Sequence, residues 1–432
     1  GARVRPGASG GTSVGKVWEA LLNKKYGATI KVRRAVAAAA ALATRNLSNA
    51  VPTVIARADA TSVGLWGNDA TVAVVDATDG DALKWNAVVV YNGVTYTYQN
   101  LNTQAGQNNL ATVVGDDIAN PVVLVKVADG RPINSAAAAL AAGTDGTIAA
   151  TDFQTPLANL AAEPGVAVGL VAGDYVTAAT VNGYIVTQAG NVSDRIFLTH
   201  SNDPTNTAAD EVTDVAAQIT TRSDRIIWCA NYAYTNDPEL GTQIQTAPHT
   251  WLASILSQTD VDIHPGAAET VALLSGISRV TMTTLNRGDL ISLKNAGICA
   301  LERTTDGFQF RSGVTTNLNP GKTEITRRRS TDYLQLAAAT RLRYYVKAKN
   351  TPINRATMIG ELVAFSKGLR GPVAGNGRII EEFQVIGEEV NTAANRAQGL
   401  EKILWRVKLI GHIRYLVLET EIGETVEITE AA

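Results

Sequence analysis

The sequence predicts a multidomain α/β protein (α+β overall), with an α/β core of parallel or mixed sheets, an inserted β-rich domain and an α+β C-terminal domain. In the middle of the chain, strands alternate with helical segments of about ten to fifteen residues, which is typical of a parallel sheet covered by helices. Before them lies a run of short segments rich in β-branched and aromatic residues. With 432 residues, the chain is long enough for roughly two to four domains.

We assign residues 1–50 to the N-terminal part of the core. Residues 1–12 are rich in Gly and Pro, which predicts an irregular lead-in. Ser13 is a candidate N-cap for a helix that extends to about Tyr26, and Thr29–Val36 alternates as a strand does. The chain begins at Gly1 rather than at Met, which is consistent with a native N-terminus, and its arm, that is missing or processed.

Residues 51–140 are predicted to form the inserted β-rich domain. Asn92-Gly93 joins Val88–Tyr91 to Val94–Tyr98, a strong hairpin signal because a two-residue type I′ turn needs positive φ at both positions. We expect one short helix, at about Asn102–Asp116, among the strands.

Residues 141–325 are predicted to form the α/β core domain. Pro164-Gly165 ends the first helix before an apolar strand. The predicted helices lie at 151–163, 174–189, 207–221 and 249–259, and the predicted strands at 166–171, 195–199 and 225–230.

Residues 326–432 are predicted to form the C-terminal α+β domain. Helical patterns cover 331–347 and 353–368, and 400–410 and 413–422 have the alternation of strands. A last short strand, Thr425–Thr429, follows Gly423 and places Val426 and Ile428 on one face. Its five residues are Thr425, Val426, Glu427, Ile428 and Thr429.

Charge and hydropathy restrict the classes of partner. The chain has 38 Lys+Arg against 40 Asp+Glu, a net charge of −2, so we expect no nucleic acid and no anionic membrane surface as partner. No apolar run reaches the ~20 residues of a membrane helix, and no signal peptide is visible. We therefore expect a protein that is made in a cytosol and does not insert directly into a membrane.

One segment imitates a phosphate-binding loop. Gly10–Val17 (GGTSVGKV) fits the spacing G-x-x-x-x-G-K, but Val17 stands where a hydroxyl would hold Mg²⁺, and no apolar strand precedes it. A P-loop ATPase therefore remains only a remote alternative.

Other candidate chemistry is sparse. Asp260, Asp262 and His264 alternate in one loop and could touch a cation, but such loops are more often solvated or cap a helix. Cys229 and Cys299 match no metal or redox spacing. No G-x-S-x-G elbow and no paired-histidine motif occurs. We therefore predict no catalytic residue, no cofactor and no metal.

The densest basic cluster is Arg327-Arg328-Arg329. It lies just before the helix predicted to begin near Thr331. A surface that meets an acidic partner and a solvated loop are equally good interpretations.

Several segments together resemble the contractile tail sheath family of myovirus-type bacteriophages, in order and spacing across nearly the whole chain. Gly64-Leu65-Trp66-Gly67-Asn68 followed by a strand is similar to the beginning of that family's inserted domain. Ala142-Gly143-Thr144-Asp145-Gly146 is similar to the return to the core, although Ala142 stands where the family often has Gly. The segments 247–267, 328–350 and 400–429 resemble later parts of the family pattern.

The resemblance implies a structural subunit and not an enzyme. Subunits would form hexameric rings, stacked helically around a tail tube, and would contract to drive the tube through the host envelope. Thr425–Thr429 would be the arm that completes a neighbour's sheet. Further implied partners are the tube, baseplate and tail terminator proteins, and the implied location is the virion after assembly in the bacterial cytoplasm. Candidate tube-facing residues are Arg355, Lys367 and Arg370.

The resemblance also implies that the inserted domain and the C-terminal domain lie at different radii. The inserted β-domain would lie on the outside of the sheath, and the C-terminal domain inside, facing the tube. A different virion, baseplate or surface-layer subunit is the alternative from the structural class.

Overall fold

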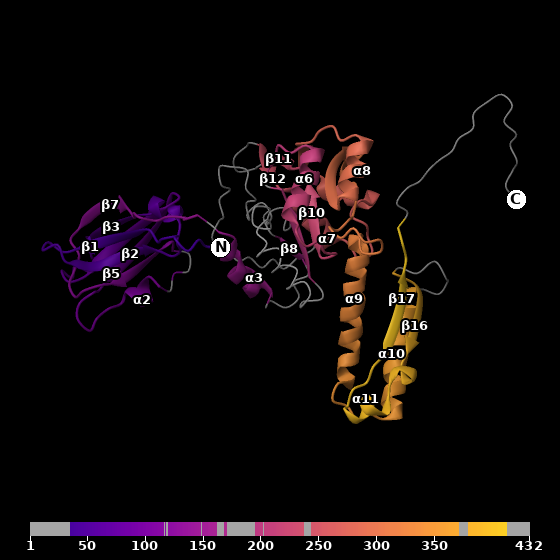
Figure 1. The fold of residues 1–432 in the computed structure, drawn as a ribbon. Coiled ribbons are helices and arrows are strands. Elements are labelled where there is room, and N and C mark those ends of the chain that lie inside the picture. Colours follow the sequence, from indigo (N-terminus) through magenta and orange to yellow (C-terminus); the bar gives the residue numbers. More distant parts are fainter. Residues whose placement is uncertain are drawn as a thin grey trace.

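The computed structural model describes residues 35–115, 117, 120–147, 149–161, 168–170, 195–201, 203–236, 243–370 and 379–412. A β-rich unit, a central α/β unit and a projecting arm follow one another along the chain (Figure 1). The mixed α and β, multidomain architecture confirms the predicted fold class.

The β-rich unit consists of two sheets around one apolar core. Asn92 and Gly93 both have positive φ, at 51° and 75°, and join β4 to β5 as the hairpin signal predicts. The short helix expected at about 102–116 is present but shorter: among the described residues of that range only α2 is helical, because Asn102 and Asn109 bond to nearby backbone and side chains instead. One sheet has the order β1-β2-β6 and the other β5-β4-β3-β7. The elements are β1 (Thr44–Ser48), β2 (Val54–Ala60), η1 (Leu65–Asp69), β3 (Thr71–Asp76), β4 (Trp85–Tyr91), β5 (Val94–Leu101), α2 (Leu110–Val113), β6 (Val122–Lys126) and β7 (Ser135–Ala139).

The β-rich unit begins earlier than residue 51. Strand β1, in the stretch that the sequence assigned to the core, pairs antiparallel with β2. Its Arg45 donates to Ala138 O at 3.0 Å and also to Val72 O, and so ties β1 to the second sheet. Of the strand predicted at Thr29–Val36, residues 35 and 36 are not in a strand and the rest lies outside the described residues.

The central unit is a five-stranded sheet of order β15-β14-β10-β9-β8. Its first four strands in chain order, β8, β9, β10 and β14, are parallel, and β15 is antiparallel. Alternate residues of β9 and β10 face opposite sides: Leu198 and Ile227 pack with α7, whereas Phe197 and Trp228 pack with α6 and α8. The predicted helix at 174–189 lies outside the described residues. The strands are β8 (Val168–Leu170), β9 (Ile196–His200), β10 (Ile226–Ala230), β14 (Ile298–Thr304) and β15 (Gly307–Phe310).

A smaller antiparallel sheet, β12-β11-β13, packs beside this core. It consists of β11 (Ala233–Asn236), β12 (Gln243–Thr246) and β13 (Ile277–Val280). The surrounding helices are η2 (Ala150–Phe153), α3 (Gln154–Ala161), α6 (Ala208–Gln218), α7 (Pro248–Gln258), η3 (Ala268–Leu274) and α8 (Arg287–Asn295).

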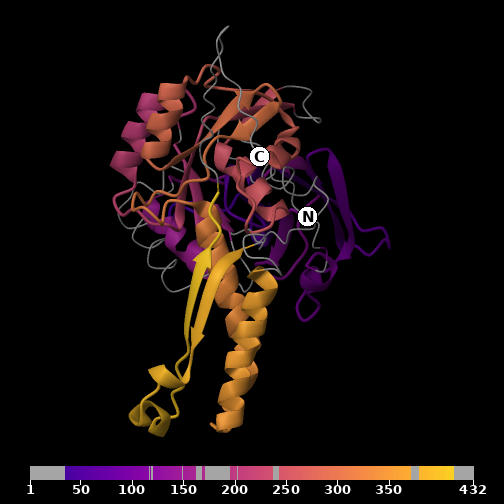
Figure 2. The same cartoon turned by 90° about the vertical axis from the view of Figure 1, so that its right-hand side faces the viewer.

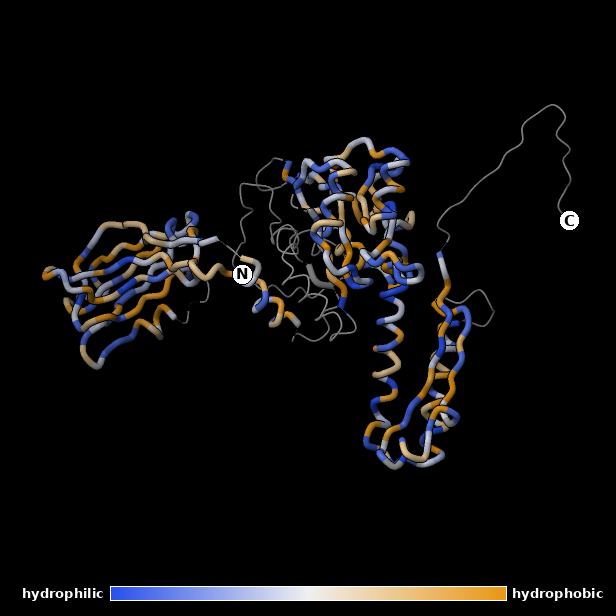
Figure 3. Tube along the Cα trace, in the orientation of Figure 1, coloured by the Kyte–Doolittle hydropathy of each residue, from blue (hydrophilic) through white to orange (hydrophobic). Residues whose placement is uncertain are grey.

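Residues 325–412, hereafter the arm, project from the core as two long helices and a β-hairpin (Figure 2). Strands β16 and β17 pair antiparallel in a two-stranded sheet, and hydrophobic residues recur along both (Figure 3). The elements are α9 (Ile325–Leu342), η4 (Arg343–Tyr345), α10 (Pro352–Arg370), β16 (Ile380–Ile386), η5 (Glu388–Val390), α11 (Ala393–Ala397) and β17 (Leu404–Leu409).

Candidate functional site: assembly surfaces of the arm

Helix α9 leaves the core through a buried set of ion pairs. Asp332 accepts hydrogen bonds from Arg225 Nη1 at 2.9 Å and Nη2 at 2.7 Å, and both residues are buried. Arg328, one turn earlier on α9, pairs with Asp332 and with Asp224. Because loss of one partner would leave an uncompensated buried charge, this set fixes the direction in which α9 leaves the core.

Arg329 closes the C-terminal end of α7. Its Nη2 donates to the carbonyl oxygens of Leu256 at 2.8 Å and Thr259 at 3.0 Å, at a helix end where carbonyls lack intrahelical partners. Burial lowers the pKa of the guanidinium to about 10, so it stays charged at neutral pH. The cluster Arg327–Arg329 thus lies within α9, and the prediction that it forms a loop before a helix at Thr331 is wrong.

The arm is held together by a thin apolar seam between α10 and the hairpin. Trp405 Nε1 of β17 donates to Ser366 Oγ of α10 at 3.0 Å, and its ring centroid lies 6.1 Å from that of Phe365. From α9, the Arg341 guanidinium lies 4.7 Å above the Phe365 ring, a cation–π contact. Few apolar side chains are therefore fully enclosed in the arm.

The distal end of the arm, residues 341–355, exposes apolar side chains; we call it the distal tip. Tyr344, Val346 and Ile353 are 75%, 69% and 78% exposed. From Tyr333 to Gly360 the sequence contains five Lys or Arg and no Asp or Glu. Exposed apolar groups within a field of one sign are typical of a surface that binds another protein.

Charge is strongly segregated along the chain. The arm contains fifteen Lys or Arg and seven Asp or Glu, whereas residues 35–324 contain fourteen Lys or Arg and 27 Asp or Glu. The net charge of −2 for the whole chain hides this division. The arm taken alone is basic enough to attract an acidic partner, so the net charge of the whole chain does not exclude electrostatic partners for it. A count by segment would have found this signal in the sequence.

The three residues predicted to face a tube all lie on α10 but do not form one cluster. Lys367 is exposed, whereas Arg355 and Arg370 are half-buried. Arg355 and Arg370 are fifteen residues apart on the helix, which is about 22 Å along its axis. Arg355 Nη1 donates to Asn350 Oδ1 at 2.9 Å, at the distal tip.

The hairpin of the arm offers two open sheet edges. Among the described residues its sheet contains β16 and β17 and no further strand. Phe383, Val407 and Trp405 face α10, while Gln384 and Arg406 are exposed on the other face. An edge strand presents unpaired backbone donors and acceptors to any added strand. The predicted donor strand Thr425–Thr429 lies outside the described residues.

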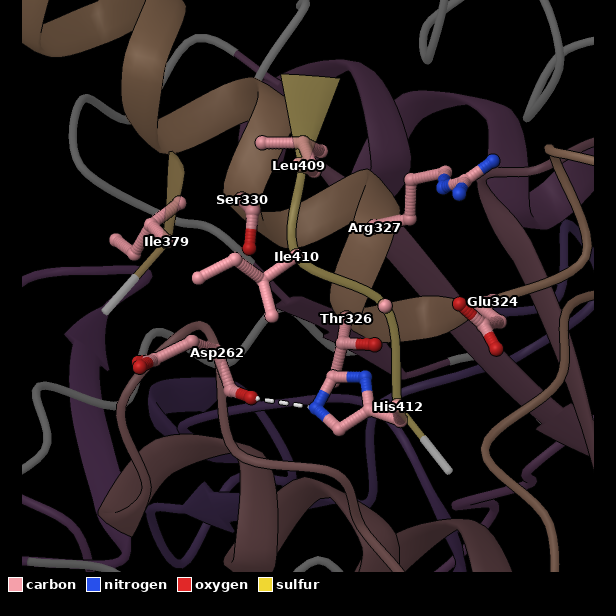
Figure 4. Close-up of a pocket in the computed structure, with 10 residues that line it drawn as sticks. Asp262, Glu324, Thr326, Arg327, Ser330, Ile379, Leu409, Ile410 and His412 are labelled. Carbon is pink, nitrogen blue, oxygen red and sulfur yellow. Dashed lines mark hydrogen bonds between the residues drawn. The ribbon is translucent and has the colours of Figure 1, made fainter. Parts of the chain in front are cut away.

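The end of β17 is fastened to the core. His412 Nε2 lies 2.9 Å from Asp262 O, and its ring lies 5.5 Å from that of His264. Beside it is a cavity of about 80 Å³, lined by both core and arm, with the buried Thr326 next to His412 (Figure 4). The arm is therefore attached at two places, at α9 and after β17.

The two sequence segments that flank the insertion meet in space. Asn68 Nδ2 donates to Gly143 O at 3.0 Å, and Gly143 N donates to Asn68 Oδ1 at 2.9 Å. Leu65 N donates to Asp145 Oδ1 at 3.1 Å. A Cβ on Gly143 would lie 2.6 Å from Gly64 O, which explains why Gly occupies this position. The β-rich unit is therefore closed at its base by its own chain.

Potential reactive groups of the core are buried in packing positions. His200 and His249 stack at 4.3 Å, and burial lowers both pKa values, that of His200 to about 4. Cys229 and Cys299 are partners in the β10–β14 register and are free thiols whose pKa values burial raises.

The loop with Asp260, Asp262 and His264 was the sequence candidate for a cation. His264 Nδ1 accepts from Gly266 N at 2.9 Å, and Asp262 contributes its backbone oxygen to His412. In the part of the chain that the structure describes, no three His, Cys, Asp or Glu side chains gather as metal ligands. Among the same described residues, no helix is both long and apolar enough to span a membrane. The predicted phosphate loop, Gly10–Val17, lies outside them.

Comparison with solved structures identifies the fold. The chain is similar to the sheath tail protein from Desulfitobacterium hafniense, with a TM-score of 0.55, 15% identity, and coverage of 86% of this chain and 82% of the other. It is also similar to the sheath tail protein from Listeria innocua, with a TM-score of 0.52, 14% identity, and coverage of 85% and 80%.

A third similar structure belongs to a related machine. A chain of the anti-feeding prophage baseplate matches with a TM-score of 0.50 at 16% identity, covering 65% of this chain and 76% of that one. No family model matches the sequence, and no curated protein matches it either. The fold of this chain is that of the contractile tail sheath proteins.

Proposed function

We propose that the chain is a structural subunit of a contractile tail sheath. Subunits assemble into hexameric rings, stacked helically around a tail tube, and contraction drives the tube through the host envelope. The observation that carries this proposal is the fold shared with two sheath tail proteins over more than four-fifths of this chain. The sequence motifs that flank the insertion give independent support, because they meet in space as one closed base.

The arm supplies the features that subunit assembly needs. Its two-stranded sheet has open edges among the described residues, and backbone pairing at such an edge can join subunits while their bodies move. Its distal tip is apolar and basic. We assign the donor strand to Thr425–Thr429 of a neighbouring copy, and tube contact to the arm, with Arg355, Lys367 and Arg370 as candidates.

Energy for contraction is stored in the assembly. The extended lattice is a kinetically trapped state, and the contracted lattice has the more favourable contacts. Such a device requires no nucleotide and no catalytic residue. The particle is built in the bacterial cytoplasm, with tube, baseplate and terminator proteins as partners.

The first test is negative-stain electron microscopy of the concentrated, purified chain. We expect hollow, striated cylinders of uniform width. If the chain remains monomeric at high concentration, a different virion or surface-layer subunit becomes the better assignment.

Tube contact is tested by charge reversal. Arg355→Glu, Lys367→Glu and Arg370→Glu, singly and combined, should weaken assembly of the sheath on tubes while cylinders without tube still form. The matched control is Lys322→Glu, on the core side of α9. Unchanged assembly on tubes by the triple variant would remove these residues from the interface.

The insertion is proposed to lie outside and to be dispensable for the lattice. Ala41 and Thr144 are bridge partners, so a short linker can replace the residues between them. We expect this shortened chain to form sheath-like cylinders of smaller outer width. A variant that folds, by circular dichroism, but no longer assembles would contradict the proposal.

A further inference from the structure

The two attachments of the arm to the core differ in strength. At the α9 root, Asp332 accepts two hydrogen bonds from Arg225, and both residues are buried. After β17, the contact rests on His412, whose Nε2 lies 2.9 Å from Asp262 O and whose ring lies 5.5 Å from that of His264 (Figure 4). We call this second contact the β17 anchor. Because His412 is only half-buried and a cavity of about 80 Å³ lies beside it, the β17 anchor is the weaker of the two.

The loop that holds His412 depends on a neutral His264. The backbone N–H of Gly266 donates to His264 Nδ1 at 2.9 Å, so this nitrogen carries a lone pair and the ring is uncharged. On the other side of the ring, a Cβ on Gly313 would lie 2.8 Å from His264 Nε2, which shows how closely the imidazole is enclosed. A second proton on the ring, at Nδ1, would point at the N–H of Gly266 and remove the hydrogen bond between them.

The charges around the β17 anchor act differently on its two rings. Asp262, Glu324 and Arg327 line the cavity beside His412. A charged His412 keeps its Nε2 donor, and carboxylates beside it favour that charge. Of the two rings, His264 has a hydrogen bond that its charged form cannot make. The charged and titratable groups on the elements that meet here are Asp260, Asp262 and His264 in the loop, Glu324, Arg327 and Arg329 at the beginning of α9, and His412 after β17.

We propose that the β17 anchor opens on acidification while the α9 root stays closed. Protonation of His264 breaks the hydrogen bond from Gly266, and the loop that presents Asp262 O to His412 rearranges. The open state binds the extra proton, so the anchor is intact above the ordinary imidazole range near pH 6.5 and is lost as pH falls through it. Guanidinium groups stay charged in this range and carboxylates lose their charge only at lower pH, so the ion pairs of Asp332 persist.

Opening of the β17 anchor leaves the arm attached through α9. The hairpin itself stays together, because β17 pairs with β16 and Trp405 packs on α10. Gly411 gives the chain between β17 and His412 room to move, since a Cβ there would meet nothing within 4 Å. Both attachments lie within one copy, so this inference does not depend on the proposed sheath function.

Distances between two spin labels on the full-length chain, measured by pulsed electron paramagnetic resonance, test this proposal. The anchor pair combines Gly411→Cys with Ser292→Cys, an exposed position of α8 in the core. The matched control, the root pair, combines Ser292→Cys with Gln335→Cys, an exposed position of α9. Native Cys229 and Cys299 are buried, so the labels react at the introduced cysteines. We expect narrow distance distributions for both pairs at pH 7.5, and a broad distribution for the anchor pair alone at pH 5.5, where an ordinary imidazole is charged about ten times as often as neutral.

Two substitutions in the anchor pair separate the roles of the rings. In His264→Asn, the side-chain oxygen can accept from the N–H of Gly266 in an Asx turn and does not titrate, so the distribution should stay narrow at pH 5.5. In His412→Gln, a side-chain N–H donor to Asp262 O remains and His264 is unchanged, so the distribution should still broaden. Hydrogen exchange of the Gly266 amide gives a second readout: its protection should fall by up to about tenfold between pH 7.5 and pH 5.5 in the unmodified chain.

Three results would overturn the proposal. The first is an anchor pair that stays narrow at pH 5.5. The second is an anchor pair that broadens as much in His264→Asn as in the parent, since another group would then carry the pH dependence. The third is a root pair that broadens together with the anchor pair, because the two attachments would then not be independent. If His264→Asn is already broad at pH 7.5, the Gly266 amide decides, and protection that does not change with pH in the unmodified chain contradicts the proposal.

Discussion

The inserted β-rich unit and the arm differ in how completely they enclose their apolar side chains. The insertion encloses one apolar core between two sheets and closes its base with Asn68 and Gly143. The arm has a two-stranded sheet, a thin seam beside Phe365, and a tip with exposed apolar side chains. The insertion therefore encloses its apolar core within one copy, whereas the arm leaves the apolar side chains of its distal tip uncovered by the described residues.

The largest expected effect comes from breaking the root of the arm. Asp332→Ala leaves the buried Arg225 without its carboxylate, and should destabilise the core and arm by about 3–5 kcal/mol. Hydrogen exchange should show loss of protection in β10 and α9 and none in β2 or β4. Asp289→Ala, at a half-buried position in the first turn of α8 where Asp289 caps the helix with Asn286, is the control, with a loss of about 1 kcal/mol. Equal loss of protection in the insertion would show that the two regions are not independent.

The stability of the core should depend on pH through the buried carboxyl group of Glu211 on α6. Trp228 Nε1 donates to Glu211 Oε2 at 2.8 Å, and burial raises the pKa of Glu211 to about 7. At pH values between about 4.3, the pKa of a Glu carboxyl group in the unfolded chain, and about 7, its pKa in the folded chain, the folded chain binds one proton more than the unfolded chain. This residue therefore makes the free energy of unfolding fall as pH rises, by roughly 4 kcal/mol at most.

Glu211→Gln should remove this pH dependence. We expect the core of the variant to be more stable than the unmodified core at pH 8 and similar near pH 4, as measured by urea unfolding. His200 acts in the opposite sense, because its pKa is lowered to about 4 and stability is lost as pH falls from about 6.5 through that value; it is present in both chains and cancels. Glu269→Gln, exposed on η3, should not change the pH profile. A stability difference independent of pH would contradict the assignment.

A smaller effect tests the closed base of the insertion. Gly143→Ala places a Cβ 2.6 Å from Gly64 O and 2.9 Å from Ala43 Cβ, and should destabilise the insertion by about 1–3 kcal/mol. Gly368→Ala is the matched control, because a Cβ there meets nothing within 4 Å. Proteolysis between 41 and 144 should increase only in the first variant. If both variants are cut equally, the base is not what closes this unit.

The smallest effect is a gain of stability. Ala142 has a φ of 66°, a left-handed conformation that costs a residue with a Cβ about 1 kcal/mol or more. Ala142→Gly should therefore stabilise the insertion by up to about 1 kcal/mol, after the larger unfolded-state entropy of Gly is subtracted. Thermal unfolding, monitored through hydrogen exchange of the β2 amides, measures this gain in stability. Ala136→Gly, within β7, should instead be neutral or destabilising.

The sequence predicted local features best where a residue type has one physical reason to be present. Asn92-Gly93 specified its turn, and α6 and α7 each begin within one residue of the predicted starts at 207 and 249. The helix expected at 102–116 is shorter than predicted because side-chain amides compete for the backbone there.

The root of the arm could not be predicted in the same way. Arg225 and Asp332 are 107 residues apart, and no local pattern pairs them. The charge of the arm was visible in the sequence but was lost in the total, since the acidic 35–324 cancels it. The distal tip could not be predicted either, because Tyr344 and Val346 lie within a helical pattern. Only the arrangement in space shows that no described residue covers their side chains.

The ion pairs at Asp332 have a mechanical consequence. Helix α9 has 18 residues and so is about 27 Å long, and one end of it is clamped into the core. A rod clamped at one end transmits torque, whereas a rod on a pivot does not. A force on the distal tip therefore exerts a torque on the core. Conversely, a rotation of the core moves the tip along an arc.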